Sequence, residues 1–161
     1  MSFRRIKRKL IVLRLLKART GVKRAEILKK DKILGGMGEN CWWEPFKIPS
    51  EPDLVFIGNN VNVATEVKFI NHDLTSKMFR NMYPDKHYTM RKGKINIGNN
   101  VFIGAGTTIL YDVNIGNNVI IGAGSIVTHD IPDNTVVAGI PAKFIKTFDE
   151  YKEYMDKNCI E

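Results

Sequence analysis

Residues 97–127 read IGNNVFIGAGTTILYDVNIGNNVIIGAGSIV and repeat with a period of six. An aliphatic residue recurs at every sixth position without a gap, at Ile97, Ile103, Ile109, Ile115, Ile121 and Val127. A period of six matches neither the 3.6-residue period of an α-helix nor the two-residue period of a plain strand. It predicts a coil of short strands with a corner every six residues, in which the aliphatic side chains point inward and stack.

The same period extends upstream of this stretch. Ile57, Val63 and Phe69 keep the spacing, and a weaker start lies at residues 37–41. The register slips once, between Phe69 and Ile97, so we expect the chain to leave the coil there as a loop over residues 74–94. Paired asparagines at 59–60, 99–100 and 117–118 suit the corners, because asparagine tolerates left-handed backbone angles.

Positive charge is concentrated at the start of the chain. The 161 residues have a net charge of +8, yet residues 1–36 hold 13 Lys and Arg against 2 Asp and Glu. The remainder is mildly acidic, which disfavours nucleic-acid binding, since such proteins usually carry their charge on the binding fold itself. No apolar run approaches the ~20 residues of a transmembrane helix. Two cysteines are too few for a disulfide scaffold, so a cytoplasmic setting is expected.

The N-terminal segment has helical spacing. Ile6, Leu10, Leu13 and either Leu16 or Lys17 fall at helical spacing, which predicts an amphipathic helix, followed by a break near Gly21 and a second helix over 22–30. We expect the apolar face to cover the end of the coil. The alternative is peripheral contact of this basic helix with an anionic membrane.

Several motifs carry a family resemblance. Residues 103–107, 115–127 and 138–143 resemble hexapeptide-repeat acyltransferases, and 69–73 with 145–151 resemble small O-acetyltransferases of bacterial surface-polysaccharide synthesis. The resemblance implies an all-β solenoid, a left-handed parallel β-helix, that uses acetyl-CoA and forms a homotrimer with active sites between subunits. The expected organisation is a basic helical cap over 1–36, the β-helix over 37–146 and a C-terminal helical tail over 147–161.

His72 is the candidate general base. Acetylating a hydroxyl near pH 7 needs a group that removes its proton, and histidine suits that task. The resemblance matches the family's catalytic histidine to His72. Asn71 and Asp73 are candidate substrate-binding residues. Asp73 could also orient His72, but neighbours on an extended strand point to opposite faces, so a backbone carbonyl or another carboxylate remains an alternative.

The resemblance also implies a binding site for acetyl-CoA. Ala105 and Ala123 match backbone contacts to the pantetheine arm, and the Ala105 N–H is the candidate oxyanion donor. The other cofactor-binding candidates by resemblance are Thr128, His129, Lys143 and Lys146. His129 departs from the family, which has lysine there, and this weakens any constant contact with phosphate. The aromatic and basic loop 74–94 suits a sugar-binding edge, a lid or an arm that packs on the next subunit.

These features predict an acetyl-CoA-dependent O-acetyltransferase that acts on a sugar or surface-polysaccharide hydroxyl. Acetyl transfer to serine, an antibiotic or an amino-sugar nitrogen stays open, as does a non-catalytic β-helix scaffold. We expect no metal, because His72, His87 and His129 are scattered and the H-x-x-x-x-H pair of γ-class carbonic anhydrases is missing.

Overall fold

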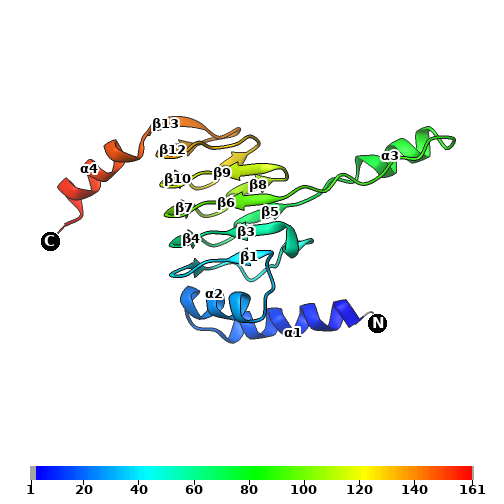
Figure 1. Ribbon diagram of the computed structural model, residues 1–161, viewed down its shortest axis with the longest axis horizontal. Helices are drawn as coiled ribbons and strands as arrows, with labels where there is room; N and C mark the ends of the chain where they lie inside the picture. The colour runs from blue at the N-terminus through cyan, green and yellow to red at the C-terminus, as the bar shows by residue number, and fades with distance from the viewer. Residues whose placement is uncertain (1–2, 161) are drawn as a thin grey trace.

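The computed structural model describes residues 3–160, with side chains from residue 8 onward (Figure 1). Three sheets form the faces of one stack of coils. The first sheet contains β1 (Gly36–Met37), β3 (Val55–Ile57), β6 (Ile95–Ile97) and β9 (Val113–Ile115). The second contains β2 (Trp42–Trp43), β4 (Val61–Val63), β7 (Val101–Ile103), β10 (Val119–Ile121), β12 (Thr135–Ala138) and β13 (Lys143–Thr147). The third contains β5 (Lys68–Ile70), β8 (Thr108–Leu110) and β11 (Ile126–Val127).

The strand register confirms the predicted solenoid. Ile95 pairs in parallel with Val113, Val101 with Val119, and Thr108 with Ile126, so one coil takes 18 residues and contributes one strand to each sheet. Three short strands per coil, with a corner after each, give a left-handed parallel β-helix of triangular section.

The six-residue period marks the interior of the stack, as predicted. All nine repeat positions named from the sequence are buried: Ile57, Val63, Phe69, Ile97, Ile103, Ile109, Ile115, Ile121 and Val127. Each stacks on its equivalent one coil away, as in the register of Phe69 with Ile109. This continuous aliphatic column removes a large apolar area from water and is the main source of stability.

Asparagine ladders line one corner of the stack. Asn60, Asn100 and Asn118 have φ values of 54°, 56° and 54°, the left-handed conformation that the sequence predicted for the corners. Their side-chain amides bond from coil to coil, with 3.0 Å between Asn60 Nδ2 and Asn100 Oδ1 and 2.9 Å between Asn100 Nδ2 and Asn118 Oδ1. The same residue type therefore sets the corner angle and ties neighbouring coils together.

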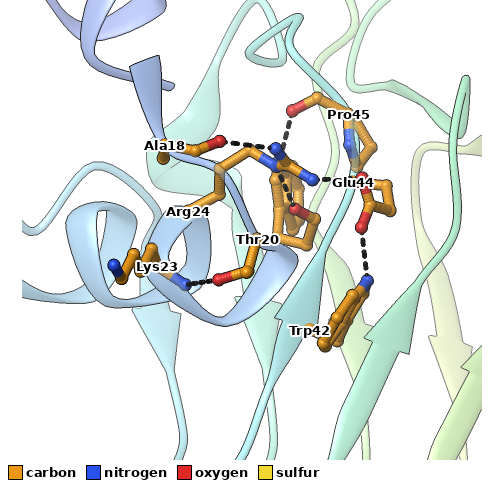
Figure 2. A network of polar contacts seen from close by, with 8 residues as sticks. Ala18, Thr20, Lys23, Arg24, Trp42, Glu44 and Pro45 are labelled. Atoms are coloured by element: carbon orange, nitrogen blue, oxygen red, sulfur yellow. Dashed lines mark hydrogen bonds and ion pairs between the residues drawn. The ribbon is translucent and has the colours of Figure 1, made fainter. Parts of the chain in front are cut away.

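Two helices, α1 (Phe3–Lys17) and α2 (Gly21–Lys30), close the N-terminal end of the stack. Figure 2 shows how a buried arginine of α2 holds the first coil. The Arg24 guanidinium donates to the carbonyls of Ala18 and Trp43, at 2.9 and 2.8 Å, and forms an ion pair with Glu44. Trp43 is buried inside the coil and stacks on Phe69 with 5.5 Å between ring centroids.

The predicted buried face of α1 is wrong. Ile11 and Leu15 pack into the core, whereas Leu10, Leu13 and Leu16 are 56%, 53% and 55% exposed. The Ile6 side chain lies outside the described side chains. The physical reason is that α1 carries apolar residues on two sides, with centres roughly 180° apart around the helix, and only one side can face the coils.

The chain leaves the stack between β5 and β6 to form the arm, which we define as residues 74–92. It contains α3 (Thr75–Met82), and Figure 1 shows it projecting well away from the coils. At the far end of the stack, β13 runs antiparallel to β12, and α4 (Phe148–Asn158) begins with a capping box between Thr147 and Glu150. Among the described residues, no helix combines the length and apolarity needed to cross a bilayer.

Candidate active site

His72 lies where the arm leaves and rejoins the coil. It follows β5 by two residues and forms an isolated antiparallel bridge with Lys92, on the returning chain. The Gly93 N–H donates to the Asn71 carbonyl at 2.9 Å, which closes the base of the arm. The register slip in the sequence thus places His72 at a fixed junction of two chain segments.

A carboxylate from a third segment orients the His72 imidazole. His72 Nδ1 lies 2.7 Å from Glu51 Oε2, and both side chains are mostly buried. Glu51 directly precedes a short 3₁₀ helix (Pro52–Leu54) that leads into β3. With the Nδ1 proton donated to this carboxylate, His72 Nε2 keeps its lone pair free to accept another proton.

Glu51 is ionised when it makes this contact. Partial burial raises the pKa of its carboxyl, but the hydrogen bonds from Lys92 and His72 outweigh that effect and set the pKa below its ordinary value. Lys92 Nζ lies 3.1 Å from Glu51 Oε1. The sequence does not point to Glu51, because this residue lies outside the six-residue repeat and no spacing links it to His72.

Asp73 does not contact His72. Its carboxylate accepts hydrogen bonds from the Thr75 hydroxyl, at 2.6 Å, and from the Tyr111 hydroxyl, at 2.8 Å. These bonds hold the pKa of Asp73 below its usual value. The Arg91 guanidinium lies over the Tyr111 ring and pairs with Asp112 at 3.1 Å. Asp73, Tyr111 and Asp112 therefore fix the two ends of the arm to the neighbouring coil.

Asn71 faces the interior of the coil. Its side chain is 1% exposed, and neither of its amide atoms has a hydrogen-bond partner among the described residues. The structure thus places the Asn71 amide away from solvent, and its contact with substrate stays a prediction. The alternation of strand residues explains this placement, since Phe69 and Asn71 point inward while Ile70 points outward.

Ala105 and Ala123 stack at one edge of the third sheet, opposite to the edge where His72 lies. They lie at equivalent corners of consecutive coils, and the Gly124 N–H donates to the Ala105 carbonyl at 2.8 Å. The following residues, Gly106 and Gly124, have φ values of 71° and 70°, and a Cβ added to either would meet nothing within 4 Å. This edge is therefore an open strip of backbone with small side chains, along which a thin extended molecule can lie closely.

The remaining candidates divide between the two edges. Thr128 and His129 directly follow β11 and lie on the His72 side, with 2.8 Å between Thr128 Oγ1 and His129 Nδ1. Lys143 is exposed at the start of β13, where it pairs with Ala138 above the alanine edge. Lys146 is paired with Val136, further along β13 and away from that edge.

One chain cannot bring His72 to Ala105. The two edges are separated by the full width of the third sheet, on the order of 20 Å for six or seven extended residues. Within the part of the chain that the structure describes, no three His, Cys, Asp or Glu side chains gather as a metal-binding group. The histidine edge and the alanine edge are thus separate features of a single chain.

Comparisons with known proteins agree with this architecture. A family model described as "Bacterial transferase hexapeptide (six repeats)" matches residues 94–129. The chain is 49% identical over 138 residues to Protein CapG of Staphylococcus aureus, covering 82% of this chain and 78% of CapG. It is 34% identical over 156 residues to galactoside O-acetyltransferase of Escherichia coli (strain K12), covering 83% and 76%.

Solved structures show the same fold. A galactoside acetyltransferase in complex with coenzyme A aligns with a TM-score of 0.68 and 28% identity, covering 92% of this chain and 82% of that one. The hexapeptide-repeat acetyltransferase VCA0836 of Vibrio cholerae also aligns with a TM-score of 0.68, at 19% identity over 89% and 90% of the two chains. The chain described here therefore belongs to the hexapeptide-repeat acyltransferase family.

Proposed function

We propose that this acyltransferase moves an acetyl group from acetyl-CoA to a hydroxyl of a sugar or surface-polysaccharide precursor, with His72 as general base. The observation that carries the proposal is the 2.7 Å contact between His72 Nδ1 and Glu51, which leaves His72 Nε2 available. An ionised partner on Nδ1 also stabilises the imidazolium that forms when Nε2 accepts a proton. Glu51 is thus a positioning residue for His72.

The proton and the acyl group move in a direct transfer. His72 Nε2 accepts the proton of the acceptor hydroxyl as that oxygen bonds to the thioester carbonyl carbon. The carbon–sulfur bond then breaks, and His72 returns its proton to the leaving thiolate, which gives free CoA thiol and an O-acetyl ester. An N–H at Ala105 is proposed to donate to the oxyanion between these steps.

The alanine edge supports donor binding. Ala105 and Ala123 offer an open strip that suits the pantetheine arm, and exposed Lys143 lies where an anionic nucleotide end would reach. Because His72 is on the opposite edge of its own chain, we place the donor against the alanine edge of the neighbouring subunit. Three subunits, with their coil stacks side by side around a threefold axis, would then form three equivalent sites.

The arm supports this assembly. Helix α3 and the residues that flank it expose the apolar side chains of Leu74, Met78, Phe79, Met82 and Tyr83, and the arm projects away from its own coil stack (Figure 1). An apolar surface on a projecting segment is typical of a protein interface. We propose that the arm packs on a neighbouring subunit beside the active site.

A cavity near His72 suits the acceptor. It has a volume of about 580 Å³ and lies between residues 45–50 and the strip from Thr65 to Ile70, two residues before His72. Phe46 contributes an aromatic wall, and Lys47, Glu66 and Lys68 add polar groups. Such a mixture of aromatic and polar groups is suited to a saccharide, which has both apolar ring faces and hydroxyls.

The test is thiol release from acetyl-CoA in the presence of nucleotide sugars, simple glycosides, amino sugars and serine. We expect release that depends on a saccharide hydroxyl acceptor and falls by about 10²–10⁴-fold in His72→Ala. Tyr154→Ala is the control, because Tyr154 is exposed on α4, away from the arm, and should leave turnover close to wild type. Release that survives loss of His72 would exclude it as the base, and acetylation of amines alone would exclude O-transfer.

A further inference from the structure

Among the described residues, no side chain covers the outward face of α1. Leu10, Leu13 and Leu16 are each more than half exposed on a helix whose other side is packed into the core. Scattered surface leucines are ordinary, but three on one helical face form a contiguous apolar stripe. This stripe therefore indicates a binding surface on α1.

The charges around the stripe indicate an anionic partner. Helix α1 contains seven Lys and Arg residues and no Asp or Glu. Lys9 and Lys17 are exposed beside the leucines, and Arg14 forms an ion pair with Asp31, the one acidic side chain that lines the adjoining groove of about 590 Å³. A leucine stripe flanked by lysine is the pattern of a helix that lies in the interface of an anionic bilayer.

The position of α1 suits such contact. Figure 1 shows α1 lying across the end of the coil stack opposite to α4, with its length perpendicular to the stack. Ile11 and Leu15 face the coils, so the leucine stripe faces away from them. In the trimer proposed above, three such stripes would share one end of the assembly and could engage one flat surface together.

We propose that the outer face of α1, defined by Leu10, Leu13 and Leu16 with Lys9 and Lys17, docks this enzyme on anionic phospholipid membranes. The leucines enter the headgroup boundary and the lysines contact lipid phosphates. Arg8 does not belong to this face, because its guanidinium donates to the carbonyls of Pro49, at 2.9 Å, and Ile48. Arg8 thus ties another side of α1 to the segment that leads to Glu51.

The experiment is sedimentation of the full chain with vesicles of phosphatidylglycerol mixed with phosphatidylcholine, and with phosphatidylcholine alone. We expect strong binding to the anionic vesicles only, and weaker binding as salt rises from about 0.05 to 0.5 M. Replacing Leu10, Leu13 and Leu16 together by Gln should lower partitioning at least ~10-fold, and Lys9→Gln with Lys17→Gln at least ~5-fold.

Matched controls replace exposed residues at the opposite end of the molecule. Met155→Gln with Ile160→Gln, and Lys152→Gln with Lys157→Gln, should leave vesicle binding unchanged. Circular dichroism and thermal unfolding of each variant check that the fold is retained. Absence of binding by the wild type, equal binding to neutral vesicles, or full binding by the folded leucine variant would overturn the proposal. So would vesicle-free association of trimers that the leucine variant abolishes, since a second copy would then occupy the face.

Discussion

The coil stack and helix α1 use similar aliphatic residues in different ways. In the stack, Ile103 and Ile109 are fully buried because each repeats the position of its neighbours and packs on them. In α1, Leu13 has the same apolar character but is exposed, while Leu15 is fully buried. Repetition fixes which face is inside, since every coil provides the same partner for the next. A segment that occurs once depends on a partner that its own sequence does not specify.

The largest difference in stability is expected between one alanine substitution in the coil stack and one on the outer face of α1. Ile109→Ala removes a fully buried side chain from the column and should lower the free energy of unfolding by about 2–5 kcal/mol. Leu13→Ala removes an exposed side chain and should change it by less than ~0.5 kcal/mol. Urea denaturation of both variants measures the two values. Equal losses would contradict the assignment of Leu13 to an unpartnered face.

The next largest loss of stability is expected where the N-terminal helices meet the first coil. Arg24→Ala removes the guanidinium that joins α2 to the Trp43 carbonyl and to Glu44, and should cost about 1–3 kcal/mol because buried acceptors lose their donor. Lys29→Ala breaks an exposed pair with Glu39 and should cost at most ~1 kcal/mol. Thermal unfolding followed by circular dichroism compares them. A larger loss for Lys29 would mean that Arg24 does not hold the cap.

A smaller loss of stability is expected from a substitution at an asparagine corner. Asn100 has a φ of 56°, so Asn100→Ala should cost about 1–2 kcal/mol from left-handed strain in addition to its ladder bonds. Asn100→Gly removes the same bonds but tolerates the angle, and should therefore be the more stable variant of the two. The difference between their urea midpoints isolates the backbone contribution. Identical midpoints would show that the ladder bonds alone matter.

The smallest effect is the pH dependence contributed by Glu51. Its pKa is lower in the folded chain than its ordinary value, so its contribution to stability is present above the unfolded pKa and is lost as pH falls through the folded one. The difference in unfolding free energy between wild type and Glu51→Gln should therefore shrink as pH is lowered from 6 towards 3. Chemical denaturation at each pH measures it. A difference that grows on acidification would contradict an ionised Glu51.

The sequence predicted the parts of the molecule that repeat or that interrupt the repeat. The inward positions, the asparagine corners and the departure of the arm after His72 all follow from one period of six. Helix α3 within the arm was not predicted, and the buried face of α1 was assigned wrongly, because a helix with two apolar stripes leaves its orientation to tertiary packing.

The candidate site was predicted only in part, because some of its residues lie outside the six-residue repeat. His72 lies at the junction that the register slip indicated, but its partner Glu51 comes from a segment outside the repeat. Asp73 was a candidate by adjacency alone, and strand alternation turned it towards Tyr111 instead. The sequence also does not bring His72 and Ala105 together, because in the proposed trimer they meet only across two subunits.

The most direct test of the central account is complementation between subunits with different defects. His72→Ala lacks the base, and Ala105→Trp blocks the donor edge, so each homotrimer should be inactive. Co-expression with two affinity tags yields mixed trimers. If each site takes His72 from one subunit and the Ala105 edge from its neighbour, every mixed trimer keeps one intact site of three, and acetyl-CoA turnover should return to about a third of wild type. Purified mixed trimers with no activity above that of the two variants would contradict a site shared between subunits.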